Sequence, residues 1–176
     1  MAVRDGRLYA LGGSATRFKR DASKTVERYD AERNVWEAVA DMSTERYACA
    51  AAVLEGKLFV MGGFNAQGHL LSSVEYYEPA SNEWKQVAPM NKARCVHAAA
   101  VWNGRLYVMG GWGADSSVEW YDLERNEWIK EEEEAFTRHF PVTKAMPFHN
   151  LTIPTVSTRY ICHVCACVCM RAHAYM

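Results

Sequence analysis

The sequence predicts an all-β fold made of about three repeated sheets, each with four short antiparallel strands. The first observation is an eight-residue stretch ending in a glycine pair, which occurs at residues 6–13, 56–63 and 104–111. The second is a Tyr followed seven residues later by a Trp in every copy. The glycine pairs lie 50 and then 48 residues apart. Self-similarity at such a period indicates stacked supersecondary units in place of one globular core.

The eight-residue stretch is predicted to be a buried strand. In residues 56–63 a turn glycine and a basic residue lead into the four apolar residues Leu58 to Met61. Because polar residues do not alternate with them, both faces of the strand should be buried. Two glycines end the stretch, where the backbone must turn sharply or approach another backbone closely.

A hairpin is predicted after each glycine pair. The motif Val-Glu-x-Tyr begins at Val26, Val74 and Val118, and an Asn stands two residues before each Trp. Asn tolerates the left-handed conformation that ends a tight loop. Such a hairpin places each Tyr opposite its Trp, and aromatic cross-strand pairs stabilise a sheet by roughly 0.2–1 kcal/mol each. The pairs are Tyr29 with Trp36, Tyr77 with Trp84, and Tyr121 with Trp128.

A small apolar run precedes the second and third glycine stretches, at residues 48–53 and 96–101. Each unit of about 48 residues therefore contains four strands, which is the composition of a β-propeller blade. The predicted blades cover about residues 1–46, 47–94 and 95–140, and the chain begins midway through the first innermost strand. Two and a half to three blades cannot close a ring, so open blade faces are expected to favour self-association or pairing with another propeller fragment.

The complete pattern resembles the Kelch repeat over about residues 1–140. It combines the glycine pair, the Tyr and Trp seven residues apart, and Met-x-x-x-Arg at residues 42–46 and 90–94. It is most similar to the Kelch-like family of cullin-3 ubiquitin-ligase substrate adaptors. The resemblance implies a partial Kelch β-propeller that recognises a protein or peptide substrate. An actin-binding Kelch scaffold and a non-functional truncated isoform remain alternatives, and cosedimentation with filaments would discriminate the first of these.

Adaptors of this family also use a BTB domain and a BACK helical region to reach the ligase. The repeats here begin at residue 1, so we do not expect this polypeptide to deliver ubiquitin by itself. Capture of a substrate, or competition with a full-length adaptor, remains compatible with the sequence.

The resemblance also implies a partner-binding face formed by two sets of loops. Residues directly after each glycine pair form the first set, and residues around the Arg after Met-x-x-x form the second. The first set is Ser14, Phe64, Asn65 and Trp112; the second is Arg46, Tyr47, Ala48, Arg94, Cys95 and Val96, followed by Arg138 and His139. Large aromatics and Arg are enriched among interface hot spots. Two structural alternatives stand beside this interpretation: the aromatics cap the blade ends, and the repeated Arg bonds loop carbonyls.

Charge and composition indicate which partners to expect. The net charge of −1 gives no electrostatic reason to expect nucleic acid, and no apolar run reaches the 18 or so residues of a membrane span. The start of the chain does not resemble a signal peptide, and Cys49 and Cys95 occupy different repeat positions, so a reducing cytoplasmic location is the simplest interpretation. The basic loop at residues 14–25 would suit an acidic or mixed peptide.

Catalytic and cofactor motifs are not found in the sequence. Gly-x-Ser-x-Gly, a phosphate loop and His-Glu-x-x-His are missing, and His69, His97 and His139 are not paired at metal-ligand spacing. His97 replaces Cys49 of the previous copy inside an apolar run, which is typical of a core histidine. We therefore expect a binding protein with no catalytic residues and no cofactor.

The segment 141–176 departs from the repeat pattern. Pro141, Pro147 and Pro154 punctuate it, and four cysteines then fall within eight residues. We expect an irregular, disordered tail foreign to the propeller. Zinc binding is the sharper alternative to unpaired, oxidation-prone thiols, although crowded ligands with little scaffold are not the usual arrangement. The candidate ligands are Cys162, Cys165, Cys167 and Cys169.

Limited proteolysis tests the predicted boundary between repeats and tail. Because an irregular tail is cleaved more readily than packed strands, a protease should first trim the chain near Phe140 while the repeats survive. Mass spectrometry of the early products measures this. Early cleavage inside the glycine stretches at an equal rate would contradict it.

Overall fold

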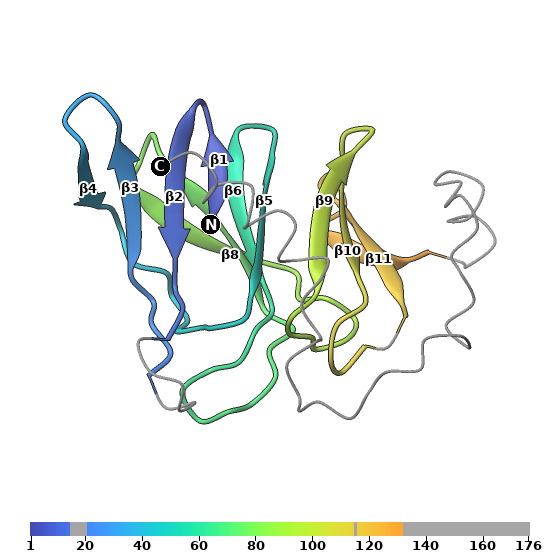
Figure 1. The fold of residues 1–176 in the computed structure, drawn as a ribbon. Coiled ribbons are helices and arrows are strands. Elements are labelled where there is room, and N and C mark those ends of the chain that lie inside the picture. Colours follow the sequence, from blue (N-terminus) through green and yellow to red (C-terminus); the bar gives the residue numbers. More distant parts are fainter. Residues whose placement is uncertain (15–20, 115, 132–176) are drawn as a thin grey trace, which may run out of the picture.

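The computed structural model describes residues 1–14, 21–114 and 116–131, which form three four-stranded antiparallel sheets (Figure 1). We number these sheets as blades one to three. Within every blade the strands follow one another in sequence order across the sheet. The predicted all-β architecture of a partial propeller is therefore confirmed. Blade one contains β1 (Ala2–Arg4), β2 (Arg7–Leu11), β3 (Val26–Asp30) and β4 (Val35–Ala38); blade two contains β5 (Ala50–Leu54), β6 (Lys57–Met61), β7 (Val74–Glu78) and β8 (Glu83–Val87); blade three contains β9 (Ala98–Trp102), β10 (Arg105–Met109), β11 (Val118–Asp122) and β12 (Glu127–Lys130).

The first strand of each blade lies at the centre of the arrangement. Strand β5 contacts β1 on one side and β9 on the other, so the blades meet through their first strands. Figure 1 shows the three sheets following one another from the β1–β4 sheet to the β9–β11 region. Strand β1 has 3 residues, whereas β5 and β9 have 5 each, which agrees with a shortened innermost strand in blade one.

The strand before each glycine pair is buried most completely in blade two. The four apolar residues of β6 from Leu58 to Met61 are 0% exposed, as the sequence predicted. In blade one only Tyr9 and Leu11 of β2 are buried, whereas Leu8 and Ala10, which alternate with them along the strand, are partly exposed. The difference arises because side chains alternate between the two faces of a strand, and in the described residues only one face of β2 is covered by another blade.

The predicted hairpins are confirmed in all three blades. Each Tyr stands directly opposite its Trp in the register, and the ring centroids lie 5.3, 5.4 and 5.3 Å apart from blade one to blade three. The loop Asn adopts the predicted positive φ, at 54°, 55° and 53° for Asn34, Asn82 and Asn126. Each Asn side chain also accepts a hydrogen bond from the hydroxyl of its Tyr, at 2.6–2.7 Å.

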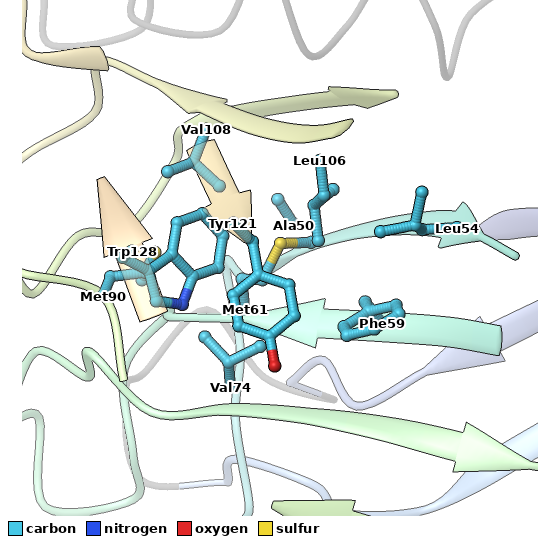
Figure 2. Packing of buried hydrophobic residues seen from close by; sticks show 10 residues of the cluster. All are labelled: Ala50, Leu54, Phe59, Met61, Val74, Met90, Leu106, Val108, Tyr121 and Trp128. Carbon is cyan, nitrogen blue, oxygen red and sulfur yellow. The ribbon is translucent and has the colours of Figure 1, made fainter. Parts of the chain in front are cut away.

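Two hydrophobic clusters hold the blades together face to face. One cluster fills the space between blades one and two, with Tyr9 and Leu11 packed towards Leu58 and Val60. The other lies between blades two and three, where Trp128 and Tyr121 lie next to Met61 and Met90 (Figure 2). Burying one large apolar side chain stabilises a fold by roughly 1.5–3 kcal/mol. The core of this chain is therefore divided among blade junctions, as expected for a repeat protein.

The sequence predictions for residues 15–20 of the basic loop and for the chain after residue 131 lie outside the described residues. These include the blade boundary at residue 140, the irregular tail and the possible zinc ligands. In the part of the chain that the structure describes, no helix is long and apolar enough to cross a bilayer.

Each glycine pair ends its strand where two backbones approach closely. A Cβ on Gly62 would lie 2.4 Å from the Arg94 carbonyl oxygen, and one on Gly63 would lie 2.5 Å from the Tyr47 carbonyl oxygen. Both glycines have positive φ, at 58° and 94°. Gly13 of blade one differs, because a Cβ built there meets no atom of the described residues within 4 Å. The sharp turn is thus common to all pairs, whereas the steric demand at the second glycine depends on the segment that arrives from the preceding blade.

This difference predicts unequal costs for two matched substitutions. Gly13→Ala should cost about 1–2 kcal/mol, because only positive-φ strain opposes it. Gly63→Ala should cost about 2–5 kcal/mol, because the clash with the Tyr47 carbonyl adds an overpacking penalty. Urea unfolding of both variants measures the two free energies. Equal costs would contradict the assignment of the clash to the blade junction.

Candidate functional site

The two predicted sets of loop residues meet at the junctions between blades. Tyr47 and Phe64 form an isolated antiparallel bridge, with N–H to carbonyl distances of 3.0 and 2.9 Å. Cys95 and Trp112 form the same bridge one blade further on, at 3.1 and 3.0 Å. The residue after each Arg therefore pairs with the residue after the next glycine pair. The structure brings together four of the residues that the sequence assigned to one face.

Three aromatic side chains from these bridges lie in a row, which we call the aromatic ledge (Tyr47, Phe64 and Trp112). The rings of Tyr47 and Phe64 are stacked with centroids 5.3 Å apart, and Trp112 meets the edge of Phe64 at 5.8 Å. Phe64 is buried at 9% exposure, whereas Trp112 is 66% exposed. Phe64 thus supports the ledge from within, and Trp112 presents its indole to solvent.

The residues after Tyr47 and Cys95 carry backbone strain. Ala48 and Val96 have φ of 53° and 50°, which is uncommon for residues other than glycine and especially for a β-branched one. The Val96 N–H donates to the Ala48 carbonyl at 2.9 Å, so the two strained segments are bonded to each other across a blade junction. Strained backbone persists only where the surroundings fix it, and it is frequent at binding sites.

Arg46 joins blade one to blade two. Its backbone N–H donates to the Ser23 carbonyl and its own carbonyl accepts from the Gly13 N–H, both at 2.9 Å and both within blade one. Its guanidinium lies in blade two, where it donates to the Gly62 carbonyl at 2.8 Å and to Glu75 Oε1 at 2.7 Å. We call this arrangement an arginine clamp.

Arg94 makes the same clamp between blades two and three. Its backbone N–H donates to the Leu71 carbonyl at 3.1 Å, and its own carbonyl accepts from the Gly63 N–H at 2.8 Å. Its guanidinium donates to the Gly110 carbonyl at 2.9 Å and to the carboxylate of Glu119. The repetition confirms the interpretation that this Arg bonds loop carbonyls.

The clamps place both arginines away from the surface. The side chains of Arg46 and Arg94 are 0% exposed, so they lie inside the blade junctions and not on the outer face that the sequence assigned to them. Cys95 is also 0% exposed. The physical reason is that each guanidinium satisfies its charge with a buried carboxylate and with backbone carbonyls. These residues can shape a partner site only by positioning the ledge.

The two glutamates of the clamps were not predicted to be partners of the arginines. Glu75 and Glu119 are each 1% exposed, and their second carboxylate oxygens accept the backbone N–H of Ser43 and Asn91 at 2.8 and 2.7 Å. A signal was present, because Val-Glu-x-Tyr repeats a Glu as regularly as Met-x-x-x-Arg repeats an Arg. Two opposite charges with the same period are candidates for a buried pair.

His97 lies beside the second clamp and is 1% exposed. Burial lowers its pKa from the usual 6.5 to about 3, and the positive charge of Arg94 contributes in the same direction. The imidazole is therefore neutral at pH 7. This agrees with a core histidine, and in the described ranges no group of three or more His, Cys, Asp or Glu could hold a metal ion.

The remaining predicted residues lie in the loops after the glycine pairs of blades one and two or beyond the described chain. Ser14 is exposed and bridges to Ala22, while Asn65 is partly exposed and caps its own loop by accepting the His69 N–H at 2.8 Å. Arg138, His139 and the candidate zinc ligands from Cys162 to Cys169 fall outside the described residues.

Blades with a glycine pair, a Tyr–Trp pair and an arginine clamp define the chain as a Kelch-type propeller protein. A family model described as the KLHDC2/KLHL20/DRC7 Kelch-repeats domain matches residues 1–153. Since this match covers most of the 176 residues, the chain belongs to this Kelch-repeat family.

Several named proteins are similar to this chain over shorter segments. Human Kelch-like protein 33 is 45% identical over 69 residues, which are 39% of this chain and 12% of that protein. Spermatocyte protein spe-26 of Caenorhabditis elegans is 44% identical over 66 residues, or 36% of this chain and 12% of its own length. Kelch repeat and BTB domain-containing protein 12 of Danio rerio is 36% identical over 69 residues, or 36% and 11%. The matched part of this chain thus spans only about an eighth of these relatives.

The depressed pKa of His97 predicts how stability depends on pH. The unfolded chain takes up a proton near pH 6.5, whereas folded His97 does so only near pH 3. The contribution of neutral His97 to the free energy of unfolding is therefore full above pH 6.5. It falls by up to about 1.4 kcal/mol per pH unit as the pH drops towards 3.

Two variants test this dependence. His97→Cys copies Cys49, the residue that blade two has at this position, and should flatten the decline of the unfolding free energy between pH 6.5 and 4. His69→Gln, on an exposed loop, is the control and should leave the decline unchanged. An unchanged decline in His97→Cys would contradict the assignment.

Proposed function

We propose that this chain is a protein-interaction module that captures a peptide segment of a partner on the face carrying the aromatic ledge. The observation that carries the proposal is the 66% exposure of Trp112 on top of the buried ring of Phe64. An exposed Trp held on a fixed support offers a large apolar contact with little loss of conformational freedom, which is typical of a binding hot spot.

The chemistry of the face supports binding and gives no support to catalysis. Its backbone is fixed by bridges between loops of successive blades, and loops fixed by a rigid scaffold commonly carry recognition. Membership of a Kelch-repeat family supports the same class of function. We propose no catalytic residues and no cofactor for this chain.

We further propose that the captured partner is a substrate of a cullin-3 ubiquitin ligase. The support is the likeness to proteins named Kelch-like, and the name of one relative includes a BTB domain. Recruitment of the ligase would depend on the BTB and BACK regions of such adaptors. For residues 1–131 we therefore propose capture of the substrate and not recruitment of the ligase. A cytoplasmic location remains a prediction from the sequence.

A displayed peptide library panned on the purified chain tests the proposed site. Enriched peptides should bind the Trp112→Ala variant at least about tenfold more weakly, because truncating a hot-spot aromatic commonly costs more than 1 kcal/mol. Fluorescence anisotropy with labelled peptides gives the dissociation constants, and thermal melts confirm that the variants are folded.

Trp120→Ala is the matched control for this experiment. Trp120 is a partly exposed indole of β11 that lies against the guanidinium of Arg105 and does not belong to the ledge. Its removal should leave the enriched peptides bound. Loss of binding in Trp120→Ala with retention in Trp112→Ala, or a failure to enrich any peptide, would contradict the proposed site.

A further inference from the structure

The two bridges of the ledge face pair different residue types in the same way. Tyr47 stands opposite Phe64 in one repeat, and Cys95 stands opposite Trp112 in the next. In each bridge the two residues exchange both backbone hydrogen bonds, at 2.9–3.1 Å. Directly opposite residues of an antiparallel pair have their side chains on the same face and close to each other. The side chain opposite Trp112 is therefore that of a cysteine, where Phe64 faces a tyrosine.

The backbone around the two bridges matches closely. A Cβ on Gly63 would lie 2.5 Å from the carbonyl oxygen of the first bridge residue, and one on Gly111 would lie 2.6 Å from that of the second. The residues that follow, Ala48 and Val96, have φ of 53° and 50°. A side chain at position 95 therefore leaves the backbone in the same direction as the side chain at position 47.

The two ledge rings differ in how much of their surface is covered. The Tyr47 ring is stacked on Phe64 at 5.3 Å with an interplanar angle of 25°, and Phe64 is 9% exposed. Trp112 meets Phe64 at an angle of 77° and is 66% exposed. Cys95 is too short to cover an indole, and among the residues that the structure describes no ring is stacked on Trp112. Blade three thus presents one half of an aromatic stack that blade two completes from its own repeat.

The surroundings of the ledge are uncharged. The clamp arginines turn their charges inwards, where each pairs with a buried glutamate. Leu70, which bridges to Phe64, and Ala93, which lies against Gly113, carry no charge. Because a charge that loses water without a partner is strongly disfavoured, the place beside Trp112 favours an uncharged group over a carboxylate or an ammonium.

The ledge offers side chains to a partner and not backbone N–H groups. The N–H groups of Tyr47, Phe64, Cys95 and Trp112 all donate within the two bridges. A partner strand that adds to a sheet edge needs such groups unpaired. Recognition at the ledge must therefore go through a side chain of the partner.

We propose that the partner peptide anchors itself by an aromatic side chain stacked on Trp112, in the place that a ring at position 95 would take. This inference rests on the proposed function and specifies the peptide: an uncharged segment with Tyr, Phe or Trp as its anchor. The stack of Tyr47 on Phe64 is the template for this contact within the same chain. Aromatic pairs are stabilised beyond what their buried area supplies, so an aromatic anchor binds more tightly than an aliphatic one of similar size.

Four displayed libraries of short peptides test the anchor. Each has one fixed central residue, Tyr, Leu, Arg or Glu, between random flanks, and each is panned in parallel on the full chain and on the Trp112→Ala variant. Tyr-centred peptides should show the largest enrichment on the full chain relative to the variant. In an enriched peptide, changing the central Tyr to Leu should weaken binding at least about threefold, and changing it to Ala at least about tenfold.

Two measurements separate this anchor from recognition of an acidic peptide. Raising the NaCl concentration about tenfold should change the dissociation constant of a Tyr-centred peptide by less than about twofold, because salt screens only charged contacts. Lys92→Ser removes the exposed cation next to Ala93 and should leave that constant unchanged. A marked loss of affinity in either measurement would overturn the uncharged anchor.

Cys95→Tyr tests the same place from the side of the protein. It copies Tyr47 and sets the chain's own ring on Trp112, so Tyr-centred peptides should bind at least about tenfold more weakly. Cys95→Ser changes a single atom and is the control, which should bind them as the unchanged chain does. Thermal melts show whether both variants fold, and if Cys95→Tyr does not fold, the four libraries decide the question alone.

Failure of this inference and failure of the proposed function give different results. If Trp112→Ala binds the enriched peptides as tightly as the unchanged chain, the proposed site is itself wrong. If Trp112→Ala loses them while Leu-, Arg- or Glu-centred peptides prevail, the ledge binds peptides and the aromatic anchor is wrong. Full binding of Tyr-centred peptides to folded Cys95→Tyr would also overturn the anchor.

Discussion

The arginine clamp is the interaction on which the rest of this structure depends. Each clamp arginine is bonded through its backbone to one blade and through its guanidinium to the next, as Arg46 shows with Gly13 and Glu75. Removing one partner of a buried ion pair commonly costs 3–5 kcal/mol, because the other charge is left without compensation. The relative placement of consecutive blades is therefore fixed by polar contacts of defined geometry in addition to apolar packing.

The clamp also explains why the motifs of the repeat occur together. The Arg94 carbonyl reaches the Gly63 N–H only because Gly62 has no side chain, since a Cβ there would lie 2.4 Å from that carbonyl oxygen. The residue after Arg46 forms the bridge that supports the aromatic ledge, so the ledge is positioned by the clamp. The buried ion pair and the backbone bridge under the ledge are thus parts of one arrangement.

Much of the fold could be predicted from the sequence because the repeat displays it three times. The strands before the glycine pairs, the Tyr–Trp register and the left-handed Asn of each hairpin all follow from local spacing and residue type. The clamp partners could not be assigned in the same way, since Arg46 and Glu75 are 29 residues apart and belong to different blades. Periodicity shows that both charges recur but does not show which meets which.

The candidate site was predictable in position but not in exposure. Phe64 and Trp112 hold the same repeat position, yet Phe64 is 9% exposed and Trp112 is 66% exposed. The difference arises because Phe64 is bridged on both sides, by Tyr47 and Leu70, and is covered by its neighbours. Such coverage depends on the length and packing of the flanking loops, which have no period in the sequence.

A double-mutant cycle at Arg46 and Glu75 tests the central claim most directly. The unfolding free energies of Arg46→Met, Glu75→Gln and the double variant are measured by urea denaturation of the full chain. If the clamp joins the blades, each single change should cost about 3–5 kcal/mol, and the double variant should cost about 2 kcal/mol or more less than their sum. Costs that add to within about 0.5 kcal/mol would contradict the account, because the two side chains would then act independently.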